Sequence, residues 1–164
     1  MRNSLQHDPI RAHQRKTVAA RRVGDNAQCA CGEKRPEALI SGSTPVICAR
    51  CQRSSKGQSI MDKHHVAGRA NGPVTVSVRA NDHRAVLSPA QYEWPRDTLA
   101  NVEELETLKA AASIRGVADI HDYLANTLLR PVAELLEKLA GLERQNRKEK
   151  SPSNRTTQKK TDCQ

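Results

Sequence analysis

The sequence predicts an α+β protein, in which a small cysteine-containing module precedes a helical hairpin or coiled-coil region. Three observations predict this fold class. Four cysteines form two close pairs between residues 29 and 51. Short β-favouring runs alternate with Gly and Pro up to about Pro95, and beyond it the composition changes to Leu, Ala and Glu. We therefore expect a basic flexible arm over residues 1–28, the module over 29–100, the helical region over 101–144 and a disordered basic tail over 145–164.

Both ends of the chain lack the apolar periodicity of packed elements. The first 28 residues mix Arg, Gln, Asn and His, and the tail is made of Lys, Arg, Ser, Thr, Asn and Gln. Segments so poor in apolar residues bury too little surface to offset the entropy lost on ordering. Disorder is therefore the prediction for both ends.

The net charge of +9 is unevenly distributed. Residues 1–28, 29–100 and 145–164 each carry +4, from 6, 10 and 6 basic against 2, 6 and 2 acidic residues, whereas residues 101–144 carry −3, from 5 basic and 8 acidic. Basic segments favour polyanions because each neutralised phosphate releases condensed counterions. DNA is the partner we expect, although charge alone does not separate DNA from RNA or from a role in solubility.

No apolar stretch approaches the roughly 20 residues that span a bilayer, and no apolar segment follows the charged N-terminus as in a secretion signal. We therefore expect a soluble, intracellular (cytoplasmic) protein with no membrane partner. In that reducing environment, paired cysteines favour a metal site over disulfides.

The two cysteine pairs predict a structural zinc ion. The chain has no Phe and a single Trp, so a large apolar core cannot hold the module together. Two tight turns that each offer two thiolates satisfy the tetrahedral geometry of zinc. The expected ligands are Cys29, Cys31, Cys48 and Cys51. Two disulfides or four free thiols are the alternative, and Cys163 in the tail is expected to be a free thiol.

Several elements follow from periodicity and from cap residues. Alternation in residues 74–78 predicts a strand, and Ser88 followed by Pro89 predicts a helix start. A helix is expected over 102–115, with Gly116 as its stop. Residues 117–142 carry one apolar stripe interrupted by Pro131, which predicts either a kink or the start of another helix. The stripe predicts a homodimer through residues 117–142 or an intramolecular hairpin.

The most informative stretch contains three histidines. Adjacent His64 and His65 end a predicted strand, a Gly-containing loop and a second strand follow, and His83 lies near a helix start. Such a hairpin plus helix brings His64 and His83 together, while His65 points to the other side of its strand. Hydrolysis of a phosphodiester needs a base for water and a cation near the phosphate, and a histidine beside a histidine-held metal provides both.

This stretch resembles the HNH endonuclease motif of ββα-metal nucleases, and the runs 64–69, 81–84 and 87–91 resemble a subgroup with zinc knuckles. The resemblance covers about Cys29 to Pro95. It implies a zinc-stabilised ββα-metal fold in which His64 and His83 hold a catalytic Mg²⁺ or another divalent cation and His65 activates water.

Other residues have expected roles at such a site. Asp62 lies on the same side of its strand as His64, so it would add a carboxylate ligand or a bond behind a ligand. Asn71 would brace the loop, because Val74 stands where the family's middle asparagine is usual. Leu87 stands where many members carry a further metal ligand. The side chains expected to contact nucleic acid are Arg69, Arg79 and Arg84.

These observations lead to one expected function and two alternatives. We expect a metal-dependent endonuclease that hydrolyses phosphodiester bonds in DNA, of the kind that would suit a phage or a mobile element. One alternative is a degenerate zinc module that binds nucleic acid without cleaving it. The other is a structural protein in which His64 and His83 complete a second closed metal site. Trp94 is expected in a small core rather than against a base.

Overall fold

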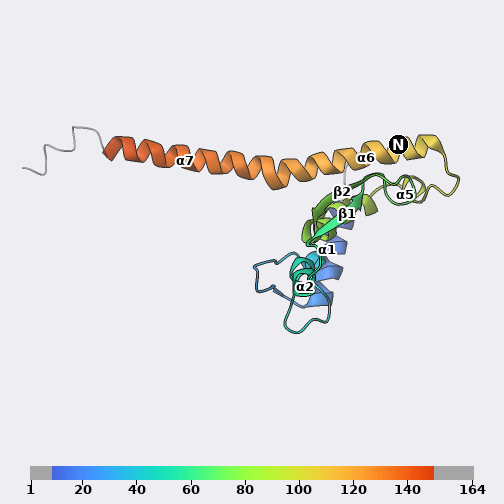
Figure 1. Cartoon of the computed structure of the whole chain (residues 1–164), viewed down its shortest axis with the longest axis horizontal. Coiled ribbons are helices and arrows are strands. Elements are labelled where there is room, and N and C mark those ends of the chain that lie inside the picture. The colour runs from blue at the N-terminus through green and yellow to red at the C-terminus, as the bar shows by residue number, and fades with distance from the viewer. Residues whose placement is uncertain (1–8, 150–164) are drawn as a thin grey trace, which may run out of the picture. The chain divides into compact units, whose positions relative to one another are not determined.

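The structure is a computed structural model that describes residues 9–149. Over these residues the chain is mixed α and β, mostly helical, with one two-stranded sheet (Figure 1). It divides into two compact units, one up to Tyr123 and one from Leu124 onward. The elements are α1 (Pro9–Val23), the 3-10 helix η1 (Pro36–Ala38), α2 (Ala49–Ser55), β1 (Met61–His65), β2 (Thr75–Arg79), α3 (Ala80–Asp82), the π-helical turn η2 (His83–Leu87), α4 (Ser88–Tyr92), α5 (Arg96–Ala100), α6 (Glu106–Leu124), the π-helical turn η3 (Ala125–Leu129) and α7 (Arg130–Glu149).

Helix α1 corrects the prediction of a flexible arm, because residues 9–23 are helical. Ala, Arg, Gln and Lys dominate this segment and are strong helix formers, so it needs no continuous apolar stripe. Val23 at its end packs against the cysteine cluster, and an Arg15–Glu93 ion pair ties its middle to the residue after α4. Residues 1–8 lie outside the described part of the chain.

The cysteine-bearing segment folds around a small core. Leu39 pairs with Cys48 in an isolated antiparallel bridge, and Cys48 then caps α2. Cys29, Leu39 and Cys48 are all buried, with Val46 and Ile47 packed against them. The β-favouring run at residues 46–47 therefore forms a bridge rather than a full strand.

Strands β1 and β2 form an antiparallel hairpin in which His64 pairs with Val76 and His65 with Thr75. The predicted strand over 74–78 is confirmed with a shift of one residue. Val78 is buried and Val76 half-buried, whereas Val74 lies before the strand and is 66% exposed. Burial along β1 puts His64 inside and leaves His65 only partly covered, because successive side chains point to opposite faces.

A continuous helical run from Ala80 to Tyr92 follows β2, and it contains the π turn η2. The expected helix start at Ser88 is wrong, since both Leu87 and Ser88 have helical dihedrals. Pro89 explains the turn. A proline has no N–H for the carbonyl four residues back, and a π turn just before it accommodates the missing bond. The Ser88 amide instead donates to the carbonyl of His83, five residues back.

Helix α6 packs on the hairpin loop through a stripe of small and polar residues. Ala112, Gly116 and Asp119 are buried along it, at spacings of four and three. The sequence predicts that a helix stops at Gly116. This prediction is wrong, because Gly116 lies in the middle of α6. A Cβ at Gly116 would lie 1.7 Å from the carbonyl oxygen of Val66, so only glycine permits this close approach.

The same stripe supports the second small core. Trp94 is buried with Ala67 and Ala112, which confirms its expected core role. Its Nε1 donates to Asp119 Oδ2 at 2.9 Å, so the indole N–H has a hydrogen-bond acceptor inside the core. Sequence periodicity missed this face because its residues are not strongly apolar.

The second unit consists of η3 and α7. Pro131 is the second residue of α7, and η3 ends two residues before it, in the same relation as η2 to Pro89. Of the two alternatives predicted at Pro131, the start of a new helix is wrong, because Leu124 and Arg130 both have helical dihedrals and the helical run continues from α6 through η3 into α7. Residues 145–149 of the predicted tail belong to α7, and residues 150–164 lie outside the described chain. None of the helices described has the length and apolarity that a membrane crossing requires.

Candidate metal centre and histidine site

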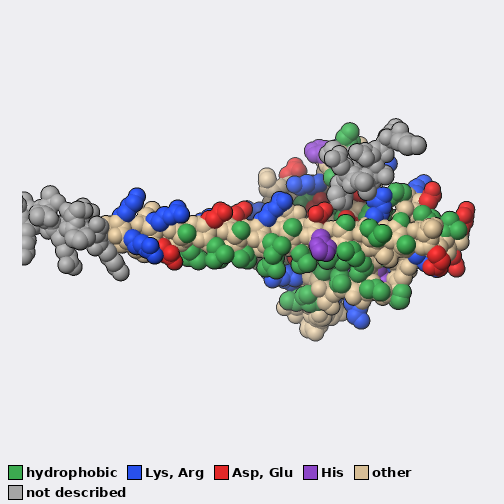
Figure 2. All heavy atoms as spheres, turned by 90° about the horizontal axis from the view of Figure 1, so that it is seen from above, with side chains coloured by type: hydrophobic (Ala, Val, Ile, Leu, Met, Phe, Trp, Pro, Cys, Tyr) green, Lys and Arg blue, Asp and Glu red, His purple; other side chains and the backbone are tan. Residues whose placement is uncertain are grey.

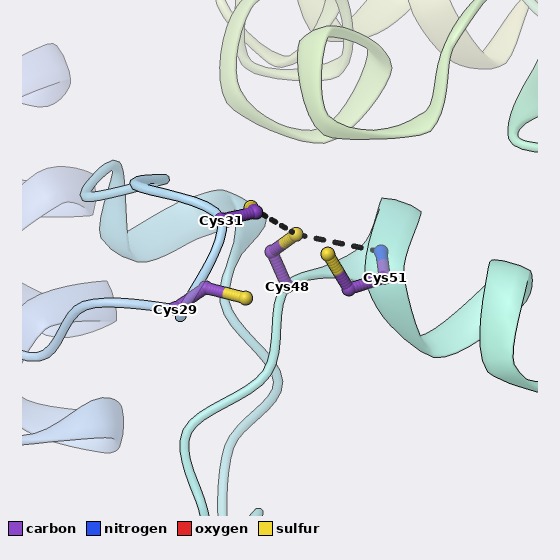
Figure 3. Close-up of side chains that lie close together, drawn as sticks. All are labelled: Cys29, Cys31, Cys48 and Cys51. Atoms are coloured by element: carbon purple, nitrogen blue, oxygen red, sulfur yellow. Dashed lines mark hydrogen bonds between the residues drawn. The ribbon is translucent and has the colours of Figure 1, made fainter.

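The four cysteines converge from two turns, as Figure 3 shows. Among residues 9–149 they form the one group of three or more His, Cys, Asp or Glu residues that could hold a metal ion, and their sulfur atoms all lie within 4.8 Å of one another. The first turn closes through a 2.8 Å bond from the Gly32 amide to the Cys29 carbonyl, with Gly32 at a φ of +90°. The second turn is the start of α2, where the Cys51 amide donates to Cys48 Sγ at 3.5 Å.

The spacing of the sulfur atoms suits a tetrahedral zinc ion. A Zn–S bond of about 2.3 Å places tetrahedral sulfurs about 3.8 Å apart, and Cys31 Sγ lies 3.6 Å from Cys48 Sγ. All four thiols are free, so the sulfur atoms approach without a disulfide. The donor set and its geometry therefore fit the metal that the cysteine spacing predicts.

The electrostatics of the cluster also favour a cation. A hydrogen bond from the Glu33 backbone amide lowers the pKa of the Cys31 thiol to about 6. The neighbouring Cys31 then raises the pKa of the Cys51 thiol to about 12, since a second thiolate so close would repel the first. A divalent ion removes this conflict because it stabilises every thiolate it binds.

A partly buried polar network joins the cysteine turns to the helix that carries His83. Arg35 Nη2 donates to both Glu33 Oε2 at 2.7 Å and Asp82 Oδ1 at 2.8 Å. Asn81 Nδ2 donates to Glu33 Oε2 at 3.0 Å, and its Oδ1 accepts from the Arg50 amide at 2.8 Å. The pKa of Glu33 is lowered to about 2, chiefly by the bonds from Arg35.

This network was not expected from the sequence. Asn81 and Asp82 belong to the run 81–84, and nothing in their spacing to residues 33–35 indicates the contact. Tyr123 of α6 adds a further bond, from its hydroxyl to Asp82 Oδ2 at 3.0 Å. The backbone directly before His83 is therefore fixed from both the cysteine turns and α6.

The structure brings together three of the predicted metal-site residues. The rings of His64 and His83 meet edge to face with centroids 5.2 Å apart. Asp62 Oδ2 lies 3.2 Å from His83 Nδ1, and Asp62 Oδ1 is bonded by Arg53. A carboxylate on Nδ1 orients an imidazole so that its other nitrogen is free for a ligand role. Asp62 thus lies behind His83, which is the second of its two predicted roles.

His64 is suited to a ligand role by its burial. Its side chain is 1% exposed, and burial, together with the neighbouring His83 and His65, lowers the pKa of His64 to about 4. The ring is therefore neutral near pH 7, as a metal ligand must be. Its Nδ1 and the Nδ1 of His65 are buried polar atoms without a hydrogen-bond partner. The unpaired Nδ1 of the neutral His64 ring is a donor atom that fits a metal ion.

Gln91 is a site residue that the sequence reasoning missed. Its Nε2 donates to the His65 carbonyl at 2.5 Å and lies 3.3 Å from His64 Nε2. In a regular α-helix, a residue eight positions after His83 would not share the helix face of His83. The π turn η2 inserts one extra residue, so Gln91 lies on the same face as His83. Pro89 was the available signal, because it predicts the irregular turn that brings Gln91 into place.

The remaining predicted residues are not gathered at the histidines. Asn71 is buried and donates from Nδ2 to the Thr98 carbonyl at 2.8 Å, so it ties the hairpin loop to the end of α5. Arg84 Nε donates to the Glu37 carbonyl at 3.3 Å. Arg69 and Arg79 are exposed. Leu87 is fully buried, so its position contributes to the core and offers no ligand atom.

Comparison of the chain with models of protein families, with curated proteins and with solved structures found no match in any of the three.

The position of Gln91 gives a prediction. Replacing Gln91 with alanine is expected to cost about 1 kcal/mol of stability, because the His65 carbonyl loses its side-chain donor and keeps only the Gly68 amide. Denaturant unfolding followed by the fluorescence of Trp94 measures this cost. The matched control is Gln58→Ala, since Gln58 is exposed and its replacement should change stability by less than about 0.5 kcal/mol. Equal midpoints for the two variants would show that the Gln91 bond contributes nothing.

Proposed function

We propose that the chain is a metal-dependent endonuclease that hydrolyses phosphodiester bonds in DNA through an HNH-type site. The observation that carries the proposal is the meeting of His64 and His83 at 5.2 Å, with Asp62 behind His83 and His65 next along β1. A two-stranded hairpin followed by a helix supplies all four residues, which is the arrangement that the resemblance implies.

Each residue has a defined task in this proposal. His64 and His83 would hold Mg²⁺ or another divalent cation, which supplies positive charge for the phosphate and the leaving 3′ oxygen. His65 accepts the proton of the attacking water through a ring nitrogen. Asp62 holds the ring of His83 in one orientation, and Gln91 fixes the backbone directly after His65.

The proposal assigns the DNA contacts mainly to charge. The formal net charge of +9 favours a polyanion, and Arg69 and Arg79 are exposed. Arg84 contributes less directly, because its guanidinium bonds the Glu37 carbonyl. The proposed partner is therefore DNA held through its phosphates, without base readout assigned to particular residues.

Plasmid nicking by the purified protein tests the proposal. We expect nicking with added Mg²⁺ or Mn²⁺ and none without, and a loss of at least about 100-fold in His65→Ala, the size typical for a general base. The control is His121→Ala, since His121 is an exposed histidine of α6 and should leave the rate unchanged. Zinc content is matched across the three proteins. Unchanged nicking by His65→Ala would rule out the assigned base.

The second candidate function is a zinc-containing module that binds nucleic acid without cleaving it. Leu87 favours it, because a fully buried leucine replaces a further ligand and leaves two histidines for the cation. Under this hypothesis neither wild type nor His65→Ala nicks the plasmid, and both retard DNA equally with the strong salt dependence of phosphate contacts.

A further inference from the structure

Helix α7 exposes an apolar face from Val132 to Leu142. None of its 20 residues is buried. The exposed fractions of Val132, Leu135, Leu139 and Leu142 lie between 46% and 56%, and Leu136 beside them is 60% exposed. Figure 2 shows hydrophobic side chains gathered along one edge of this helix, which is located from Figure 1. Helices in proteins gain most of their stability from packing of an apolar face, so a partner that covers this face would stabilise α7.

The spacing of these residues is that of a coiled coil. From Val132 onward these residues, apart from Leu136, are separated alternately by three and four positions. Each of them therefore occupies an a or a d position of a heptad repeat. The a positions are Val132, Leu139 and Asn146, and the d positions are Leu135 and Leu142. A β-branched residue at a and leucines at d favour two strands, and a single asparagine at a specifies a parallel pair in one register.

The charged residues that flank the a and d positions favour a second copy of α7 as the partner. Lys138 occupies a g position and Glu143 the following e position, five residues later. In a parallel pair of identical helices, g of one chain lies beside the following e of the other, so Lys138 meets Glu143 twice across the dimer. A second copy of this chain is thus complementary to α7 in shape and in charge.

We propose that α7 forms a parallel two-stranded coiled coil with α7 of a second copy, in register from Val132 to Asn146. The Asn146 side chains face each other across the seam, and Leu136 widens the covered apolar strip at an e position. This dimer is independent of the proposed nuclease, because none of its residues lies at the histidine or cysteine sites.

Sedimentation equilibrium of the full chain tests whether the dimer exists. The wild type is expected at twice the chain mass of 18.1 kDa at micromolar concentrations. Leu135→Arg places a charge in the seam and is expected to weaken association by at least about 100-fold, so that the single-chain mass is measured. The control is Ala133→Arg, since Ala133 at a b position is exposed and the dimer should persist. A monomeric wild type, a higher oligomer, or equal masses for the two variants would overturn the proposal.

A charge exchange tests orientation and register. Lys138→Glu and Glu143→Lys each place like charges across the parallel seam, and each is expected to raise the dissociation constant about 2- to 10-fold, in line with the small energies of exposed pairs. The double exchange restores both pairs and should return the dissociation constant to the wild-type value. A double variant that associates no better than the single variants would contradict the parallel register.

Discussion

Chelating zinc from the purified protein is expected to unfold the first unit. A structural zinc ion contributes about 10–16 kcal/mol of binding free energy, whereas a whole domain of this size is stable by only about 5–15 kcal/mol. The apolar core around the cysteines is small, with three buried residues at its centre. Trp94, the single tryptophan of the chain, reports the loss because it lies in the neighbouring core of the same unit. Its emission should shift to the red on chelation and return when zinc is restored.

Cysteine variants separate this effect from unspecific actions of the chelator. Cys48→Ser removes a fully buried thiolate from the cluster and should reproduce the red shift without any chelator. Cys163→Ser is the matched control, because Cys163 belongs to neither of the two close cysteine pairs of the sequence. It should bind one zinc per chain and unfold at the wild-type temperature. A chelated wild type that keeps its emission and its cooperative melt would show that the cluster needs no metal.

Replacing Gly116 with alanine is expected to cost about 2 kcal/mol or more, despite the better helix propensity of alanine. The new Cβ would lie 1.7 Å from the Val66 carbonyl oxygen and 2.6 Å from its carbon, and backbone atoms cannot step aside as a flexible side chain can. Helix α6 must move away, which strains the bond from Trp94 to Asp119 and the bond from Tyr123 to Asp82. Thermal unfolding followed at Trp94 should show a Tm about 8 °C lower, or more.

Gly141→Ala provides the matched control for this prediction. Gly141 lies in the middle of α7, and no atom lies within 4 Å of a Cβ built there. Alanine should therefore stabilise that helix by about 0.5–1 kcal/mol, the ordinary difference between the two residues. If Gly116→Ala also proved neutral or stabilising, the close packing of α6 on the hairpin loop would be wrong.

The cysteine and histidine patterns gave the most reliable predictions. Metal-ligand chemistry constrains both residue type and spacing, so the four sulfurs were expected to converge, and they lie within 4.8 Å of one another. Period-two alternation likewise located the second strand to within one residue and placed His64 and His65 on opposite sides of the first. The assignment of these sites to an endonuclease stays a prediction that the nicking experiment tests.

The errors have common physical causes. Helix α1 was missed because its stability comes from helix-forming residues and an ion pair rather than from an apolar stripe. The sequence predicts a helix stop at Gly116 because glycine often ends helices. In the structure the missing Cβ instead lets α6 lie close to the Val66 backbone. Pro89 was assigned to a helix start because a π turn, which leaves the helix unbroken, has no simple signature in sequence.

The network of Glu33, Arg35, Asn81 and Asp82 connects the cysteine cluster to the histidine site. Glu33 and Arg35 take their positions from the turn that follows Cys31, and they in turn fix the residues directly before His83. We expect a chain whose cysteines hold no metal to lose that turn, and His83 then to lose its fixed place opposite His64. Metal binding at the cysteines is therefore expected to precede formation of the histidine pair.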